Sequence, residues 1–158
     1  MNVLVITESC FGNTARVAEA IATGLRSRNA TVTVAAASSG PALDGVHLLI
    51  LGAPTHNMGI PSPASRRQAR EKGGQAPATG VAEWLEALPG DPGCRVVAFD
   101  TVTGTGFFSG SAAKSIEKRL RRRSVSVIAR KSFLVTSTQG PLADGELDRA
   151  EQWGASLA

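Results

Sequence analysis

Short apolar runs alternate with stretches of helical periodicity along this chain, and this alternation restricts the fold more than any other feature. Runs of strand length cover residues 2–6, 30–36, 46–52, 94–100 and 125–137. Such an alternation is typical of a parallel sheet covered by helices. We therefore predict an α/β fold, a doubly wound five-stranded parallel sheet in a three-layer sandwich.

The segments between these runs differ in how clearly they predict helices. Apolar residues recur at helical spacing from Val17 to Leu25, and further helices are predicted over 81–90, 111–123 and 144–158, the last capped by Asp144. Residues 53–80 are expected to form a long irregular connection. The third run, "VHLLILG", is apolar almost throughout, which predicts a central strand buried on both faces. The fifth run is expected to be interrupted near Arg130.

Size and composition fit one domain over residues 1–158. No apolar run approaches the roughly 20 residues that a membrane helix needs, and no signal peptide is apparent. We therefore expect a cytoplasmic protein without membrane attachment. The cysteines, Cys10 and Cys94, form no metal-binding pattern with the two histidines, so we expect two free thiols and no metal site.

Positive charge is concentrated in one segment of the chain. Between Lys114 and Lys131 there are eight basic residues and one acidic residue, Glu117, which gives +7; the net charge is +4, so the remainder carries −3. Either this segment binds nucleic acid, or it is a solvated helix face with Ile116 and Leu120 turned inward. No aromatic residue is interleaved with the basic ones, which disfavours nucleic acid.

The segment "TESCFGNTAR" follows the first apolar run directly and leads into a helix. A helix N-terminus leaves backbone N–H groups without partners and favours an anion there. Ser9 and Thr14 add hydroxyl groups, and Gly12 permits close approach of the backbone. These features indicate a phosphate cradle, with an ordinary helix cap at Ser9 or Asn13 as the alternative. Since the loop has no Lys, a nucleoside-triphosphate site is disfavoured.

Two other unusual loops follow the third and fourth runs, at 53–65 and 100–110. In an open parallel sheet the loops at the carboxyl ends of the strands meet at one edge, where ligands bind. The "GTGFFSG" stretch at 104–110 has a weak dinucleotide-binding look, but it lacks the full glycine spacing. We expect it to form a wall of the same site.

Three stretches, "ITESCFGNTARVAEAIATGL", "GAPTHNMGIPSPASR" and "AFDTVTGTGFFSGSAA", together resemble the three cofactor loops of flavodoxins in order and spacing. The resemblance implies strand order 2-1-3-4-5 and the cofactor FMN. It places the FMN phosphate among the first loop's residues and the ribityl chain and ring between the other two loops. The cofactor-binding residues it implies are Ser9, Cys10, Phe11, Gly12, Asn13, Thr14, Pro54, Thr55, His56, Asn57, Met58, Asp100, Thr101, Val102, Thr103 and Phe107.

The resemblance implies electron transfer through FMN held noncovalently, with a separate redox partner protein and no catalytic side chain. Flavodoxins commonly place aromatic residues on both faces of the ring, whereas this chain offers His56 on one side and Thr105 or Phe107 on the other. Arg66, Arg67, Arg70 and Lys72 follow the second loop, and we expect their positive potential to raise the flavin midpoint potential. Two alternatives stay open: an NAD(P)H-dependent quinone or flavin reductase, and a regulatory module with weak or lost flavin affinity.

Overall fold

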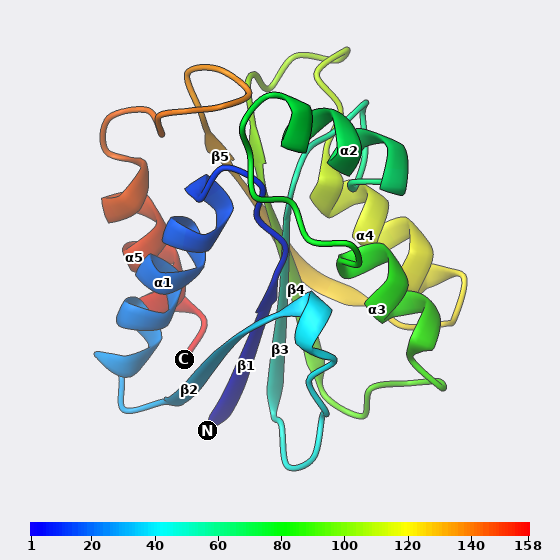
Figure 1. The fold of residues 1–158 in the computed structure, drawn as a ribbon. Helices are drawn as coiled ribbons and strands as arrows, with labels where there is room; N and C mark the ends of the chain where they lie inside the picture. Colours follow the sequence, from blue (N-terminus) through cyan, green and yellow to red (C-terminus); the bar gives the residue numbers. More distant parts are fainter.

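A five-stranded parallel sheet forms the middle layer of the computed structural model, which describes residues 1–158 (Figure 1). Across the sheet the strands are β2 (Thr31–Ala36), β1 (Asn2–Thr7), β3 (Leu48–Pro54), β4 (Arg95–Val102) and β5 (Val127–Leu134). The predicted α/β fold and the order 2-1-3-4-5 are therefore confirmed. The helices are α1 (Asn13–Arg26), α2 (Pro63–Glu71), α3 (Val81–Ala87), α4 (Ala112–Arg121) and α5 (Glu146–Ser156), with a short 3₁₀ turn at Ala37–Ser39.

The central strand β3 is buried on both faces, as its apolar sequence predicts. Leu49 and Leu51 belong to the core beneath α3 and α4, whereas Leu48 and Ile50 belong to the core beneath α1 and α5. Successive strand residues face opposite sides, so a strand covered by helices on both faces must be apolar at every position. Figure 1 shows α1 and α5 side by side on one face and α3 and α4 on the other.

Helices α1 and α5 approach each other closely because each presents a glycine to the other. A Cβ atom on Gly24 would lie 1.9 Å from the Glu151 carbonyl oxygen, and one on Gly154 would lie 2.1 Å from the Ile21 carbonyl oxygen. No larger residue fits at either position without separating the helices. The position of α1 therefore depends on α5.

The predicted irregular connection at 53–80 is wrong in its middle third, which forms α2. Ser62 and Ser65 form a reciprocal capping box, and Pro63 stands in the first turn, where it needs no N–H partner. The helix buries Arg66 and Ala69 rather than an apolar stripe. Since hydrophobic periodicity is the signal that predicts a helix, α2 gives almost none.

Two smaller predictions are also corrected. Helix α5 begins after Gly145, whose φ of 79° lies in the left-handed region, and Asp144 does not act as its cap. The irregularity of β5 lies at Ile128 and not near Arg130, because Val127 pairs with Val96 and Ala129 pairs with Val97. In α4, Ile116 and Leu120 are fully buried, as expected for the inward side of a basic helix.

A fully buried ion pair joins the end of β1 to α2. The guanidinium Nε of Arg66 donates to Glu8 Oε2 at 2.7 Å, and its Nη2 lies 2.6 Å from Glu83 Oε1 in α3. Glu8 also accepts from the backbone N–H of Val81 at 3.0 Å. Burial alone would lower the pKa of Arg66, but the hydrogen bonds that it donates to Glu8 and Glu83 raise the pKa above its ordinary value. One guanidinium thus ties together β1, α2 and α3.

The residue that precedes α3 must be glycine for this network to form. A Cβ atom at Gly80 would lie 1.8 Å from Glu8 Oε1 and 2.7 Å from Arg66 Nη2. The Gly80 backbone N–H donates instead to Glu83 Oε1 at 2.8 Å. The Arg66 and Glu8 side chains are both fully buried, so their charges depend on one another.

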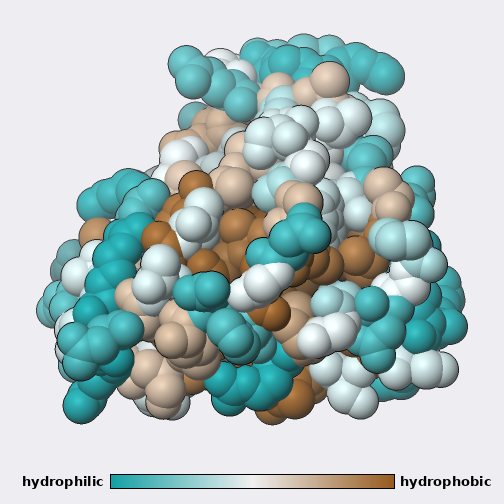
Figure 2. Space-filling view, turned by 90° about the horizontal axis from the view of Figure 1, so that it is seen from below, coloured by the Kyte–Doolittle hydropathy of each residue, from teal (hydrophilic) through white to brown (hydrophobic).

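The opposite edge of the sheet, at the amino ends of the strands, carries no comparable polar network. Figure 2 views the molecule from this side, where hydrophobic residues gather in the middle and hydrophilic residues surround them. A shallow hollow there is lined by Met1, Val46, Cys94 and Ile128 among others. No helix in the structure combines the length and the apolar character required to span a bilayer.

Replacing Arg66 by Met should lower the free energy of unfolding by about 3 to 5 kcal/mol, because Glu8 would stay buried without a cation. Combining Arg66→Met with Glu8→Leu should recover part of this loss, since the fully buried carboxylate is removed, whereas Glu83 is partly exposed and the Val81 N–H loses its acceptor. Urea denaturation measures both. The control is Arg26→Met, which removes an exposed pair with Glu19 at 3.8 Å and should cost less than about 1 kcal/mol. Equal losses for Arg66→Met and Arg26→Met would contradict the role of the buried pair.

Candidate functional site

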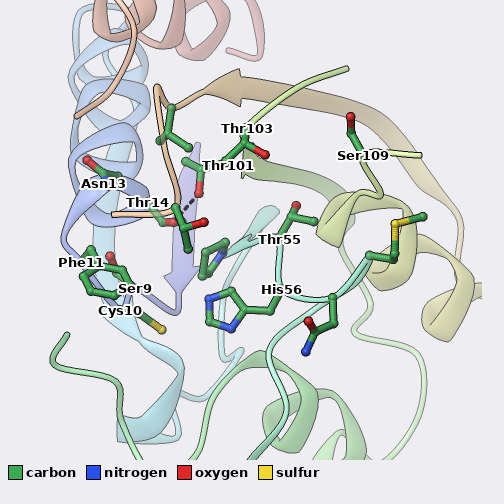
Figure 3. A pocket seen from close by; sticks show the side chains of 15 residues that line it. Ser9, Cys10, Phe11, Asn13, Thr14, Thr55, His56, Thr101, Thr103 and Ser109 are labelled. Atoms are coloured by element: carbon green, nitrogen blue, oxygen red, sulfur yellow. Dashed lines mark hydrogen bonds between the residues drawn. The ribbon is translucent and has the colours of Figure 1, made fainter. Parts of the chain in front are cut away.

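Four chain segments meet at the carboxyl edge of the sheet and enclose a slot of about 210 Å³. They follow β1, β3, β4 and β5, so the slot lies where open parallel sheets bind ligands. Figure 3 shows Thr14, Thr55 and His56 around the same space. The residues that line the slot are Ser9, Cys10, Phe11, Asn13, Thr14, Pro54, Thr55, His56, Asn57, Met58, Thr101, Thr103, Ser109, Val135 and Thr138.

Four of the predicted site residues do not line the slot. The alternation of side chains along β4 explains two of them, because Thr101 faces the slot while Asp100 and Val102 face away. Gly12 shapes the first loop without presenting a surface to the slot. Phe107 is 92% exposed and borders a neighbouring hollow.

Asp100 holds the start of α4 instead of facing the slot. Its Oδ2 accepts from the Ser111 hydroxyl and from the backbone N–H of Ala113 at 2.9 Å. Thr55 Oγ1 accepts from the N–H of the adjacent residue, Ala112, at 3.0 Å. These bonds fix the loop after β3 and the end of β4 to the start of α4, which sets the separation between the two walls of the slot.

Three lining residues escaped the sequence prediction: Ser109, Val135 and Thr138. The last two belong to the connection after β5, which lies outside the three predicted ligand loops. The signal was present in "TSTQG" at 136–140, a run of small polar residues directly after a strand. Applying the rule of the carboxyl edge to the fifth strand as well would have found it.

The first loop presents several backbone N–H groups without acceptors. The Ser9 hydroxyl oxygen accepts from the N–H of Gly12 at 3.1 Å and of Ala15 at 3.4 Å, which leaves its own proton free to be donated. The N–H groups of Cys10, Phe11, Asn13 and Thr14 have no acceptor within the protein. Gly12 adopts φ 89° before the first turn of α1, a conformation that brings successive N–H groups toward one point.

No charged side chain lines the slot. Glu8 and Arg66 lie behind the first loop and neutralise each other. Across the slot floor, the hydroxyls of Thr14 and Thr101 are 2.9 Å apart, a buried hydrogen bond drawn in Figure 3. A ligand at the first loop is therefore held by backbone dipoles and hydroxyl groups, an arrangement that suits an anion such as a phosphate.

The loop after β3 makes a tight turn at the other end of the slot. The backbone N–H groups of His56 and Gly59 each donate to the other residue's carbonyl oxygen, at 2.8 and 2.9 Å. Between them, Asn57 and Met58 have φ of 47° and 74°. A left-handed conformation is uncommon for methionine and carries strain that the surrounding contacts must offset. Met58 is held by its carbonyl oxygen, which accepts from the Ser111 N–H at 3.2 Å.

The imidazole of His56 points into the slot and is anchored from behind by Ser65, whose Oγ lies 2.9 Å from Nδ1. Burial lowers the pKa of His56 below its ordinary value of 6.5; Glu8 opposes this change, and Arg66 and Lys72 add to it. The ring is therefore neutral at pH 7. Ser65 belongs to α2, so the helix that sequence reasoning missed also positions a predicted site residue.

Cys10 does not supply a nucleophile to the slot. Burial raises the pKa of its thiol to about 11, with Glu8 contributing in the same direction. The residue is 3% exposed and packs against Ala69 and Ala76. The thiol is protonated at neutral pH and serves as a small apolar group beneath the loop.

We expect the neutral state of His56 to appear in the pH dependence of stability. Because the pKa is lower in the folded than in the unfolded protein, this contribution is fully present above pH 6.5 and is lost as the pH falls through the folded pKa. Between about pH 7.5 and 5, the wild type should lose more unfolding free energy than His56→Asn, which keeps a polar group near the Nδ1 position. Parallel losses in the two proteins would contradict the shift.

Several flavodoxins are among the solved structures to which this fold is similar. A flavodoxin from the domain Archaea matches 100% of this chain and 96% of its own, with a TM-score of 0.65 and 21% identity. Flavodoxin 1 from Bacillus cereus matches 99% and 97%, with a TM-score of 0.68 and 20% identity. Two-electron reduced Megasphaera elsdenii flavodoxin matches 98% of each chain, with a TM-score of 0.61 and 19% identity.

Similarity to known proteins is found by comparing structures but not by comparing sequences. No family model matches the chain, and no curated protein matches it. At about one identical residue in five, the solved structures bear on the fold and not on the ligand. From its sheet order, its helices and these similarities, the chain has the flavodoxin fold over its whole length.

Proposed function

We propose that this protein binds FMN noncovalently in the slot and acts in electron transfer. The observation that carries the proposal is the first loop, where four backbone N–H groups without acceptors surround Gly12 at the N-terminus of α1. No lysine, arginine or acidic residue shares this position. A phosphate monoester, which accepts several hydrogen bonds and carries negative charge, is the ligand that such a loop suits.

The hydroxyl groups of the slot support the same ligand. Ser9 can donate its proton to a phosphate oxygen, because its oxygen already accepts two backbone N–H groups. The pair Thr14 and Thr101 shares one proton in its mutual hydrogen bond, so the other hydroxyl proton can be donated to a ligand. Beyond them, Thr55, Asn57, Thr103 and Ser109 offer polar groups along the slot to a polyhydroxylated chain.

The part of the slot that would hold the flavin ring offers fewer binding groups than the part that would hold the phosphate. Among the lining residues only Phe11 and His56 carry aromatic rings, and Phe11 packs beside Cys10 at the first loop. The tryptophans lie elsewhere: Trp84 Nε1 donates to the Pro41 carbonyl, and Trp153 packs against Phe133. We therefore expect the phosphate contacts to supply a larger share of the binding free energy than stacking of the ring.

A role as an electron carrier fits the chemistry of the slot better than a self-contained enzyme. Bound FMN would supply the capacity to accept and release electrons. The chain itself places no carboxylate, amine or thiolate beside that group, because no charged side chain lines the slot and the Cys10 thiol is protonated. Its residues bind and orient the ligand and shield one side of it from water.

The expected rise in midpoint potential rests on fewer cations than the sequence indicated. Arg66 is paired with Glu8 and Glu83 and contributes no net positive charge near the slot. Arg67, Arg70 and Lys72 remain exposed on or just after α2. We still propose a potential above that of acidic flavodoxins, carried by these three residues and by the basic segment of α4. A spectroelectrochemical titration of the FMN-loaded protein measures it.

An FMN titration followed by flavin absorbance and fluorescence tests the proposal directly. Uptake at micromolar concentration supports it, whereas a protein that takes up no FMN would be a module that keeps only the fold. Adding NADPH to the loaded protein then separates two flavin functions. Reduction only through a separate reductase supports the carrier, and rapid bleaching by NADPH alone would identify a reductase.

Gly12→Asp should weaken FMN binding by about 100-fold or more, because it places a carboxylate against the phosphate. Gly12→Asn is the matched control, since it has the same shape and the same cost of a side chain at φ 89° but no charge. No atom lies within 4 Å of a Cβ at this position, so steric overlap does not confuse the comparison. Equal affinities for the two variants would show that the phosphate does not lie at the first loop.

A further inference from the structure

Beside the slot lies a second hollow of about 490 Å³, between α4, β5 and the loop after β4. It shares Met58 with the slot but differs from it in character. Here both large apolar and cationic side chains line the surface. We use the term basic-aromatic face for Met58, Phe107, Phe108, Lys114, Lys118 and Arg130.

The large apolar side chains of this face are unusually exposed to solvent. Phe107 is 92% exposed, Phe108 is 84% exposed, and Met58 is 55% exposed. The two phenyl rings stack edge to face on each other, with centroids 5.2 Å apart, and contact no other aromatic residue. Three large apolar side chains held in water beside one another mark a surface that another molecule covers.

The cationic part of the face is largely free of counter-charges. Neither Lys114 nor Lys118 has a carboxylate within 4.0 Å, and Arg130 is held by Glu117 at 2.8 Å. Glu117 is the only acidic residue among the eight basic ones of the segment 114–131. Such an excess of one sign steers a partner of the opposite sign and raises its rate of association.

The loop that carries the phenyl rings is fixed at its base. Gly110 lies so close to Met58 that a Cβ atom would be 2.3 Å from the Met58 Cα, and the Ser111 N–H donates to the Met58 carbonyl. Figure 1 shows this loop rising above the carboxyl ends of the strands, with α4 leading away from it. A molecule seated on the face therefore reaches the rim of the slot.

We propose that the basic-aromatic face docks the acidic surface of an electron-transfer protein, with Phe107 and Phe108 at the centre and Lys114, Lys118 and Arg130 at the rim. A large aromatic centre within a charged rim is the usual composition of a protein interface. A nucleic acid is the weaker match. A nucleic-acid site places cations in a row that follows the phosphate backbone, whereas the cations of this face surround an apolar centre. Docking is a property of the face itself; its use in electron transfer rests on the proposed function.

The probe for this proposal is a plant-type [2Fe–2S] ferredoxin, an acidic electron carrier, with basic cytochrome c as the opposite-charge control. We expect ferredoxin to shift the ¹⁵N-amide resonances of Phe107, Phe108, Lys114 and Lys118 at low ionic strength, where the Debye length is about 30 Å. The shifts should weaken at about 0.15 M salt, and cytochrome c should cause none at these residues. The titration is run on the protein with and without FMN.

Matched variants separate a specific face from general attraction. Lys114→Glu with Lys118→Glu should weaken ferredoxin binding at least about 10-fold, and Phe108→Ser should do so at unchanged net charge. The control, Arg16→Glu with Arg28→Glu, makes the same change of charge at exposed residues of α1 and the turn after it, and should weaken binding less than about 2-fold. FMN affinity should be unchanged by the lysine variants, which lie outside the slot.

Three results would overturn the proposal. The first is equal weakening by both charge-reversal pairs, which would mean attraction to net charge alone. The second is ferredoxin shifts confined to another surface, or none at all. The third is binding of a labelled single-stranded oligonucleotide at this face that persists at about 0.15 M salt while ferredoxin does not bind. Docking without FMN uptake would refute the proposed function and leave the face; FMN uptake without docking would do the reverse.

Discussion

The buried ion pair between Glu8 and Arg66 is the interaction on which the rest of the site depends. Glu8 directly follows β1 at the start of the first loop, while Arg66 stands in the middle of α2. Each charge is fully buried, so neither can leave the other without a large desolvation cost. The pair therefore fixes α2 beside the first loop, and with α2 come Ser65 and the anchored ring of His56. A polar contact, not an apolar core, sets the shape of this edge.

The same pair explains why sequence reasoning succeeded for the sheet and failed for α2. Strands such as "VHLLILG" are predictable because covering both faces requires an apolar residue at every position. The carboxyl-edge rule then places the loops of residues 9–14 and 54–58 together. Helix α2 buries an arginine, which reads as a surface residue unless its partner Glu8 is seen, 58 positions away. A charge pair of this kind has no local signal, so only the folded chain shows it.

At the site, the positions that could be predicted from the sequence are those in the short connection between a strand and the helix that follows it. Ser9, Asn13 and Thr14 are fixed by the passage from strand to helix, and they line the slot. Asp100 and Val102 were misplaced because the sequence shows that a strand ends near them, but not which face each residue takes. Phe107 was expected at the ring and lies outside the slot, since the hydrogen bond from Ser111 to Met58 and the close approach of Gly110 to Met58 set the base of its loop. The connection after β5 contributes lining residues that the carboxyl-edge rule also predicts, once it is applied to the fifth strand.

The paired glycines of α1 and α5 have a consequence for how the first loop tolerates change. Because the helices meet backbone to backbone at Gly24 and Gly154, a substitution in α5 transmits directly to α1, with no flexible side chain between them to absorb it. The N-terminus of α1 carries the free N–H groups, so a displacement of α5 would re-aim them. Substitutions in α5 therefore change the affinity for an anion at the first loop, although α5 does not line the slot. Anion affinity can thus be tuned through a helix that makes no contact with the ligand.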